Sequence, residues 1–378
     1  MVSTRVPPGV VRRASTGADH SGHRLALADR GRARRLRGLG RGFGTHRHIF
    51  APKHLVGRGF GIARRIFAPK HPESGAVSAA GAECSCPPTL QLPKPSDAGK
   101  VPVIDASTQL IRTQVGCALT FEVDDHVVLA LQVAAASSTG SFEVEQLAVT
   151  LDEKSIAVDE VRVEHGGRVH LITCGAGHLN VDYYAIVQRA VTADQPPTLA
   201  ERLFAVRPSR YCPSDLLEAF AEAELNMPDD LADRGRMVGD WVSGRLRYEL
   251  GSSGPFDTAV DTLLAGRGVC RDFAHLTVAL CRTVGVPARL ASVYAPGVFP
   301  MDFHAVAEVA TPDRWEVVDA TRLAPRQSLV RIATGRDAGD TAFSTTLDGS
   351  AELISYSVTA FVLGDLPIDD ITSAVTLP

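Results

Sequence analysis

The chain lacks several features that would assign it to a specialised class of protein. No stretch approaches the roughly 18 to 20 uninterrupted apolar residues of a membrane-spanning helix, because charged residues interrupt every apolar run. The seven cysteines include no Cys-X-X-Cys pair, so neither a disulfide framework nor a zinc-finger pattern is indicated. We therefore expect reduced cysteines, a cytoplasmic location and no association with a membrane.

Acidic residues are scarce at the start of the chain. Residues 1–71 hold 16 Lys or Arg and only two acidic residues, a net charge of +14, whereas the remainder holds 23 basic and 41 acidic residues, a net charge of −18. Within this basic segment GRGFGTHRHIFAPKH (40–54) returns as GRGFGIARRIFAPKH (57–71), and neither copy has an apolar face to bury. We expect residues 1–75 to form a disordered tail. Translation that begins upstream of the natural start would account for such a tail. An arm for nucleic acid and a transit peptide are the alternatives.

A β-rich region follows a linker. Residues 76–100 are rich in Ser, Ala, Gly and Pro, which is typical of linkers. Over 101–195, strand-like runs alternate with the Gly-containing turn signals SSTG, HGG and GAGH, so we expect a small antiparallel β-sandwich. The expected strands cover 120–136, 144–152, 161–165, 169–175 and 182–190. The four histidines in this region show no catalytic spacing.

Helical patterns replace the strands from 196 onward and lead into a domain that we place at 196–330. The expected helices cover 199–206, 214–225, 231–250 and 258–266. Ser214 is the expected N-cap of the second helix. Beyond this domain, residues 331–378 are expected to add one strand (353–363) and a weakly ordered end.

The most informative stretch is GRGVCRDFAHLTVALCRTVGVPARL, residues 266–290. Its apolar residues recur at helical spacing from Cys270, and Gly285 is a stop signal, so we expect a helix that begins at Cys270. A cysteine at a helix N-terminus faces unpaired backbone N–H groups and the positive end of the helix dipole. Both favour the thiolate, which is the nucleophilic form of cysteine.

Two strands with alternating apolar residues follow, at 303–311 and 314–321, and TPDR (311–314) between them is typical of a hairpin turn. This hairpin would bring His304 and Asp319 side by side. Together with Cys270 they can form a relay in which His304 holds the thiol proton and Asp319 orients His304. The N–H of Cys270 is a candidate oxyanion donor. We expect the second donor in the segment that contains Trp241 and Tyr248.

A metal site is the competing use of these residue types. Cys270, Asp272, His275, His304 and Asp319 offer suitable ligand atoms, but their spacing gives no short ligand clamp. Asp272 is better interpreted as a partner of the helix dipole, and His275 as a packed residue. Cys281, in the apolar part of the same helix, is interpreted as inert packing. We therefore expect no metal ion and no cofactor.

These motifs resemble the bacterial transglutaminase-like superfamily, of the cysteine protease or amidase type. The resemblance rests on the run from Gly268 to His275, the Gly-Val-Pro-Ala-Arg run at 285–289, and the strands of His304 and Asp319. RPSRYCPSD (207–215) is similar to the lead-in of such proteins, and 101–192 to their N-terminal β domain. The resemblance implies a papain-like α+β core with Cys270, His304 and Asp319 as its triad. The chain departs from the family at Val306, where Trp is frequent, and at Ala320, where Pro is frequent.

The expected function is that of a cysteine-nucleophile hydrolase or acyl transferase that acts on an amide bond of a peptide or protein. Hydrolysis is favoured over cross-linking because nothing indicates the calcium loops of the large cross-linking enzymes. The alternative from another class is a non-catalytic module that keeps the fold and binds a partner through its β domain. Nucleic acid is expected to bind, if at all, only through the basic tail 1–75.

Overall fold

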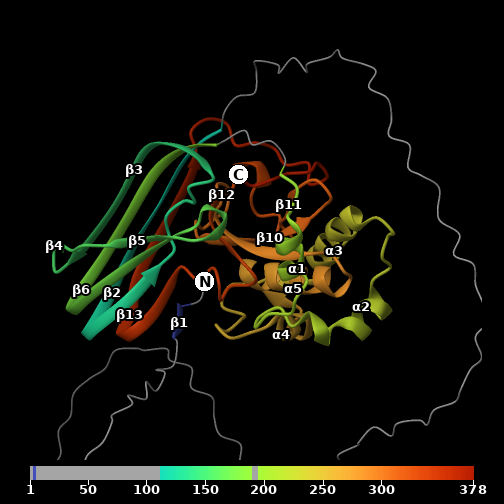
Figure 1. Ribbon diagram of the computed structural model, residues 1–378, viewed down its shortest axis with the longest axis horizontal. Helices are drawn as coiled ribbons and strands as arrows, with labels where there is room; N and C mark the ends of the chain where they lie inside the picture. Colours follow the sequence, from blue (N-terminus) through green and yellow to red (C-terminus); the bar gives the residue numbers. More distant parts are fainter. Residues whose placement is uncertain (1–2, 6–110, 190–194) are drawn as a thin grey trace, which may run out of the picture. The chain divides into compact units, whose positions relative to one another are not determined.

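The computed structural model describes residues 3–5, 111–189 and 195–378, which belong to one compact unit (Figure 1). The predictions for the tail 1–75 and the linker 76–100 lie outside these residues, apart from a short strand at 3–5. The α-helices are α1 (Leu199–Ala205), α2 (Glu218–Glu224), α3 (Leu231–Arg245), α4 (Ala259–Ala265) and α5 (Cys270–Thr283). The strands of the large sheet are β1 (Ser3–Arg5), β2 (Arg112–Leu131), β3 (Gly140–Leu151), β4 (Lys154–Ser155), β5 (Asp159–Arg162), β6 (Arg168–Arg189) and β13 (Ser344–Val362). The other strands are β7 (Arg247–Tyr248), β8 (Arg267–Gly268), β9 (Ala288–Tyr294), β10 (Phe303–Ala310), β11 (Trp315–Val318) and β12 (Val330–Gly335).

The expected β-sandwich is not confirmed. The described strands of this region form one continuous sheet in the order β1-β13-β2-β6-β3-β4, with β5 also paired to β6, whereas a sandwich needs two facing sheets. The GAGH sequence is not a turn but lies inside the long strand β6. Gly177 there has a φ of +142°, and a Cβ at this position would lie 2.6 Å from the Asp152 carboxylate. These glycines therefore serve an irregularity in the pairing of β6 with β2.

The C-terminal part of the chain is not a separate region. Strand β13 pairs antiparallel with β2, so the large sheet combines segments from both ends of the described chain. Strand β12 belongs to the smaller sheet of the helical domain. Residues after β13 form no further helix or strand, but they contact this domain: the N–H of Val317 donates to the carbonyl of Val375 at 2.7 Å, and Arg326 forms an ion pair with Asp369 at 2.8 Å.

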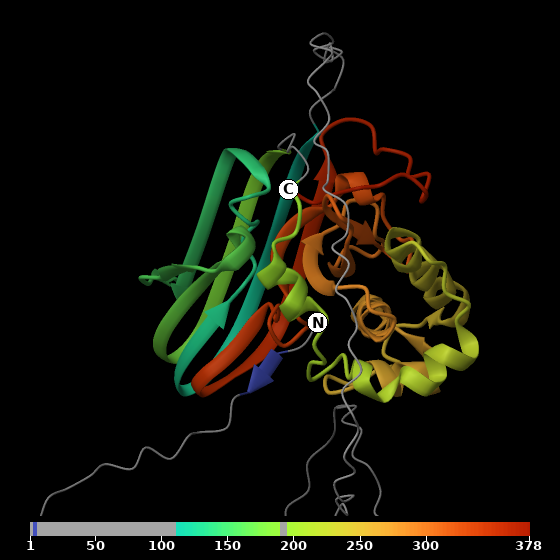
Figure 2. The same cartoon turned by 45° about the vertical axis from the view of Figure 1, so that its right-hand side comes forward.

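The smaller sheet, in the order β11-β10-β9-β12, is antiparallel and lies between two layers (Figure 2). On one face, residues such as Ala307 and Val309 pack with Val238, Leu276 and Leu280 of the helices. At the end of the same face, Tyr294 and Phe303 join the hydrophobic cluster of the large sheet, and on the other face Val293 and Val306 pack with Leu377 near the C-terminus. The predicted mixed α and β architecture is therefore confirmed at the level of the helical domain and its sheet.

Local sequence signals explain the helix that starts at Cys270. The Asp272 carboxylate accepts the N–H of Val269 at 2.8 Å, which satisfies one of the donors left free at a helix N-terminus. At the other end, Gly285 has a φ of +80°, and the N–H of Val286 donates to the carbonyl of Cys281. This is the glycine-based helix termination that the sequence predicts.

Other helix boundaries differ from the prediction. The expected helix 214–225 is a short 3₁₀ segment (Ser214–Leu216) followed by α2, and Ser214 makes no side-chain cap. Helix α3 ends at Arg245, because the next residues pair as β7 with β8. This early end is what directs Tyr248 toward the residues that precede Cys270.

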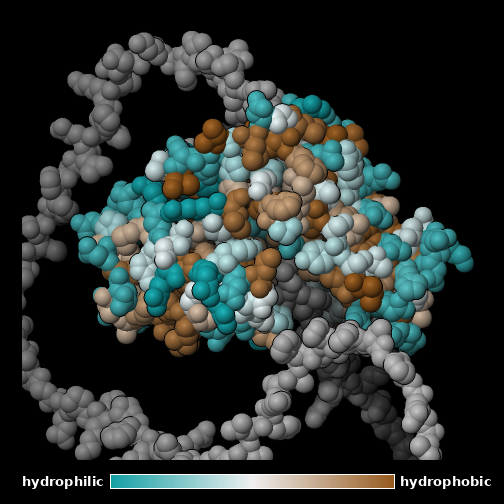
Figure 3. Space-filling model, turned by 180° about the vertical axis from the view of Figure 1, so that it is seen from behind, coloured by the Kyte–Doolittle hydropathy of each residue, from teal (hydrophilic) through white to brown (hydrophobic). Residues whose placement is uncertain are grey.

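None of the helices in the described part of the chain is long and apolar enough to cross a membrane. Apolar side chains are exposed at many separate positions, Phe299 being 92% exposed. On the face shown in Figure 3, hydrophobic residues lie in several groups with hydrophilic residues between them.

Candidate active site

Cys270 is the first residue of α5, and its side chain is largely buried, with 8% exposure. Its Sγ atom lies 3.9 Å from the carbonyl oxygen of Phe303, the first residue of β10. The helix N-terminus and the start of β10 therefore meet at the thiol. The helix dipole is oriented to stabilise negative charge on this sulfur.

The predicted hairpin brings His304 and Asp319 together. Strands β10 and β11 pair with Ala307 opposite Val318, which places Asp319 just beyond the end of β11. His304 Nε2 lies 2.9 Å from Asp319 Oδ2, and both side chains are buried. The other carboxylate oxygen accepts both the N–H of Thr321, at 2.9 Å, and its hydroxyl, at 2.7 Å. Asp319 is thus held from both sides, and it fixes the orientation of the imidazole.

The charges in this arrangement favour an imidazolium paired with a carboxylate. Burial works to lower the pKa of His304, but the Asp319 charge, its hydrogen bond and the neighbouring Cys270 thiol together raise it to about 10. Burial works to raise the pKa of Asp319, yet the charge and hydrogen bond of His304 and the bonds from Thr321 lower it. Because Asp319 engages Nε2, Nδ1 is the imidazole nitrogen left for the thiol of Cys270.

Of the two residues considered for the second oxyanion donor, only Tyr248 lies beside the thiol. Tyr248 pairs with Gly268, and its ring packs on that of Phe273 at 6.0 Å between centroids. Burial, followed by the charges of Cys270 and Asp302, raises the pKa of the phenol, while the backbone N–H of Cys270 lowers it. The hydroxyl is therefore next to that N–H. Trp241 instead packs edge-on against Phe220 among the helices.

Two residues near Cys270 are not predicted from the sequence. Asp302 precedes β10, and its Oδ1 accepts the N–H of Phe303 at 2.7 Å. Tyr356 lies on β13 and donates its hydroxyl to Asp302 Oδ2 at 3.3 Å. No local signal identifies Tyr356, because it contacts Asp302 only through the pairing of β13 in the large sheet.

The remaining candidates of the sequence analysis have other roles. Asp272 is fully buried and forms an ion pair with Arg271 at 2.7 Å, in addition to its capping bond. His275 stacks on Tyr211 and accepts the N–H of Ala338 at 3.1 Å, as expected of a packed residue. Burial raises the pKa of Cys281 to about 12, in keeping with inert packing. Across residues 111–189 and 195–378, no group of three or more His, Cys, Asp or Glu side chains is arranged to hold a metal ion.

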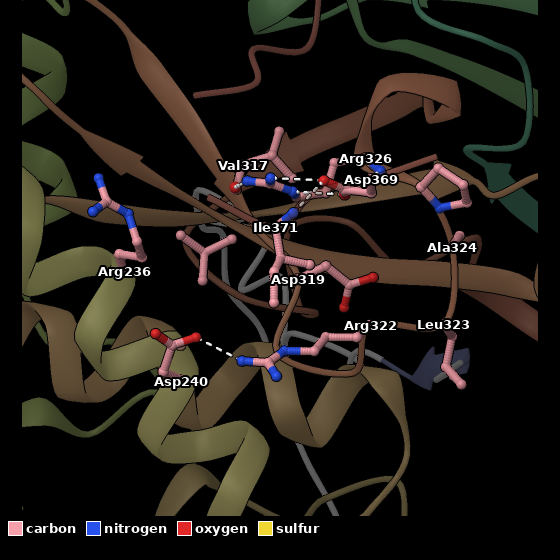
Figure 4. Close-up of a pocket in the computed structure, with 13 residues that line it drawn as sticks. Arg236, Asp240, Val317, Asp319, Arg322, Leu323, Ala324, Arg326, Asp369 and Ile371 are labelled. Atoms are coloured by element: carbon pink, nitrogen blue, oxygen red, sulfur yellow. Dashed lines mark hydrogen bonds and ion pairs between the residues drawn. The ribbon is translucent and has the colours of Figure 1, made fainter. Parts of the chain in front are cut away.

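A cavity of about 210 Å³ lies behind Asp319, between α3, the loop after β11 and the C-terminal segment (Figure 4). Its walls carry two ion pairs, Arg322 with Asp240 and Arg326 with Asp369. The lining includes neither Cys270 nor His304, and Asp319 directs its carboxylate to His304. We therefore do not assign this cavity as the place where a substrate meets the thiol.

Comparison with known proteins agrees with this geometry. The model of the transglutaminase-like superfamily matches residues 219–320, from α2 to the residue after Asp319. A crystal structure of a candidate cysteine protease from Cytophaga hutchinsonii superposes with a TM-score of 0.63 at 28% sequence identity, and the similarity covers 70% of this chain and 96% of that one. Residues 219–320 of the chain therefore form a domain of the transglutaminase-like superfamily. The resemblance identified from the sequence is thereby confirmed.

Two further similarities are more limited. A protein of Mycobacterium leprae is 43% identical over 54 residues, which is 14% of this chain and only 19% of that relative's length. The periplasmic domain of TgpA from Pseudomonas aeruginosa is 18% identical with a TM-score of 0.29, over 58% of this chain and 92% of that domain. That score is too low to support an argument about this chain.

Proposed function

We propose that this protein is a cytoplasmic cysteine hydrolase or acyl transferase that cleaves an amide bond of a peptide or protein. Cys270 is the nucleophile, His304 the acid and base, and Asp319 the residue that orients His304. The observation that carries the proposal is the buried 2.9 Å contact of His304 with Asp319 directly beside a thiol at a helix N-terminus. The cytoplasmic location rests on cysteine usage, since Cys117, Cys174, Cys212, Cys270 and Cys281 are all free.

In the first half of the reaction, the Cys270 thiolate attacks the amide carbonyl carbon and forms a C–S bond. The negative charge passes to the carbonyl oxygen, where the N–H of Cys270 and the hydroxyl of Tyr248 are the proposed donors. The C–N bond then breaks, and the His304 imidazolium gives its proton to the departing amine. A thioester on Cys270 remains.

In the second half, water attacks the thioester carbon and gives one proton to His304, which is now a neutral base. The C–S bond breaks, the acid is released, and Cys270 leaves as a thiolate that again pairs with the imidazolium. A second amine in place of water would give transamidation by the same steps. We favour water because the chain shows no sign of calcium loops.

Substitution of Cys270 by Ala tests the proposal. We expect wild-type protein to release the fluorophore from members of a panel of peptide amides and to accumulate a thioester, detected as an added acyl mass on Cys270. The Cys270→Ala variant should show neither signal while its unfolding transition is unchanged. The matched control is Cys174→Ala on β6, which removes a free thiol of the large sheet and should keep full turnover.

Turnover that survives in the Cys270→Ala variant would contradict the assignment of the nucleophile. If the wild-type thiol also reacts only as a free cysteine does, the alternative of a non-catalytic binding module becomes the better account.

A further inference from the structure

Asp302, which directly precedes β10, carries a partly exposed carboxylate that has no basic partner in the part of the chain that the structure describes. Asp302 accepts one backbone N–H and one phenol hydroxyl, from Phe303 and Tyr356. Two fully buried carboxylates of this domain differ, because Asp272 is paired with Arg271 and Glu308 with two arginines. Each oxygen of Asp302 thus keeps acceptor capacity for one more donor.

Asp302 also precedes the residue whose backbone carbonyl contacts the reacting sulfur. It is adjacent in sequence to Phe303, whose carbonyl oxygen lies 3.9 Å from Sγ of Cys270, and its own carboxylate is held against the N–H of the same residue at 2.7 Å. A group bound to this carboxylate would therefore lie beside an amide that Cys270 attacks.

Two partly exposed tyrosines lie near the same carboxylate. Tyr356 on β13 is 50% exposed, and Tyr248 on β7 is 37% exposed. Burial raises the pKa of both phenols, and the charges of Asp302 and Cys270 raise it further. Both phenols therefore lie close enough to Asp302 and Cys270 for those charges to act on them, and aromatic faces attract cations.

We propose that Asp302, oriented by Tyr356, binds a cationic amine of the substrate next to the scissile amide. This inference rests on the proposed function of Cys270. The chemistry that it names is a primary ammonium, which a peptide supplies either as its free α-amino group or as a lysine side chain. Asp302 is a specificity residue in this account and takes no part in bond breaking.

Charged thiol reagents test the subsite without a known substrate. Three methanethiosulfonates of similar size carry an aminoethyl cation, a neutral hydroxyethyl group or a sulfonatoethyl anion. In each, the Cys270 thiolate attacks the sulfenyl sulfur, forms a disulfide and releases methanesulfinate. We expect wild-type Cys270 to react about tenfold faster with the cationic than with the neutral reagent, and more slowly still with the anionic one.

Variants assign this preference to Asp302. Asp302→Asn should bring the ratio of cationic to neutral rates close to one, and Tyr356→Phe should reduce it by a smaller factor. The matched control is Asp159→Asn, which makes the same change in net charge. Asp159 lies on β5, which is separated from β13 by strands β2 and β6, so this variant should keep the wild-type ratio. A ratio that Asp302→Asn leaves unchanged would overturn the inference.

The two levels of the proposal fail in different ways. Rapid labelling of Cys270 with no preference for charge would overturn the subsite and leave the nucleophile in place. Slow labelling by all three reagents, with the pH dependence of a free thiol, would overturn the proposed function and the subsite with it.

Peptide substrates then distinguish the two sources of the ammonium. Peptide amides are compared with free and acetylated α-amino groups, and with lysine and norleucine beside the scissile bond. A value of kcat/KM that falls about tenfold on acetylation identifies the α-amino group, and one that falls on the change to norleucine identifies the side chain. In either case Asp302→Asn should remove the preference, and equal values for all four substrates would contradict the inference.

Discussion

Strand β10 holds two buried charged groups only four residues apart, and their partners differ in kind. Glu308 is paired with Arg289, at 2.9 Å, and with Arg331, at 2.8 Å. His304 is paired with Asp319, at 2.9 Å, and faces a thiol. One strand therefore carries two different sites. The charges of the Glu308 site are fixed by arginines, whereas the His304 site has an imidazole that can bind and release a proton.

The Glu308 site joins parts of the fold. Arg289 comes from β9 and stacks over the Trp315 ring at 4.0 Å, and Arg331 comes from β12 and donates to the carbonyl of Pro378 at 3.0 Å. Burial works to raise the pKa of Glu308, but the two arginines lower it to about 2. Arginine does not release its proton in proteins, so this site has no acid or base to offer.

The His304 site has the opposite character. The imidazole titrates, its neighbour Cys270 is a nucleophile when ionised, and Asp319 can stabilise either protonation state of the ring by orientation alone. The comparison teaches that burial and a short ion pair do not by themselves indicate a candidate catalytic site. A titratable group in contact with a second reactive group is the feature that indicates one.

The largest expected effect is on stability at the Glu308 site. Glu308→Gln should lower the free energy of unfolding by about 3–5 kcal/mol, because two buried arginines lose their counter-charge. Chemical denaturation measures this, with Glu352→Gln on the exposed part of β13 as the control. Under conditions where the variant is folded, the rate of Cys270 alkylation should equal the wild-type rate. A loss of stability below about 1 kcal/mol would contradict the structural role.

The complementary change at the other site is expected to act on reactivity. Asp319→Asn should lower the rate of Cys270 alkylation at pH 6.5 by about 100-fold, because the imidazolium that stabilises the thiolate loses its carboxylate; a factor of 100 corresponds to about 2.7 kcal/mol. Asp240→Asn, in the cavity behind Asp319, removes a carboxylate without touching His304 and should react as wild type does. Mass spectrometry of the labelled peptide measures both rates. Equal rates for the two variants would mean that Asp319 has no part in activating the thiol.

The two sites should lose their stabilising effect at opposite ends of the pH range. The folded-state pKa of His304 is raised to about 10, so its contribution is complete below its unfolded pKa of about 6.5 and is lost as the pH rises through about 10. The folded-state pKa of Glu308 is lowered to about 2, so its contribution is present above about 4.3 and is lost as the pH falls toward 2. The difference in unfolding free energy between wild type and His304→Gln should therefore shrink by on the order of 3 kcal/mol between pH 7 and 10. The difference between wild type and Glu308→Gln should shrink only as the pH falls toward 2. The assignment would be contradicted if the His304 difference shrank in acid and the Glu308 difference at high pH.

The smallest effect is expected at Thr321, which holds Asp319 through its hydroxyl. Thr321→Val keeps the backbone bond and the side-chain volume but removes the 2.7 Å hydroxyl bond, so the unfolding free energy should fall by about 1 kcal/mol. The rate of Cys270 alkylation at pH 6.5 should fall by a smaller factor in Thr321→Val than in Asp319→Asn. Thr321→Ser keeps the hydroxyl and should label at close to the wild-type rate, and a Thr321→Val variant that labels as fast as wild type would contradict a role for the hydroxyl bond.

The geometry around Cys270 could largely be predicted, because local signals specify it. Asp272 and Gly285 mark the two ends of α5, and the TPDR turn with alternating apolar residues specifies the hairpin that joins His304 to Asp319. These signals act over a few residues, so they can be read from one sequence. The chemical roles of the three residues remain predictions.

The large sheet and the border of the site could not be predicted in the same way. Gly175 and Gly177 satisfy the rules for a turn, but in β6 they accommodate an irregularity against β2, and only the partner strand reveals this. The contact of Tyr356 with Asp302 depends on β13, whose pairing with β2 joins residues more than 200 positions apart. Long-range strand pairing leaves no local pattern, which is why the sequence predicts a sandwich where the structure has a single large sheet.

The most direct test of the account is the rate of iodoacetamide labelling at Cys270 against pH, for wild type beside His304→Ala. A free cysteine thiol, with a pKa of about 8.5, is largely protonated at pH 6. We predict that wild-type Cys270 is labelled readily at pH 6. In His304→Ala, Cys270 should be labelled only as the pH approaches the pKa of a free thiol. Wild-type labelling that begins only near pH 8.5 and is indifferent to His304 would contradict an assembled Cys270–His304–Asp319 relay and favour the binding module.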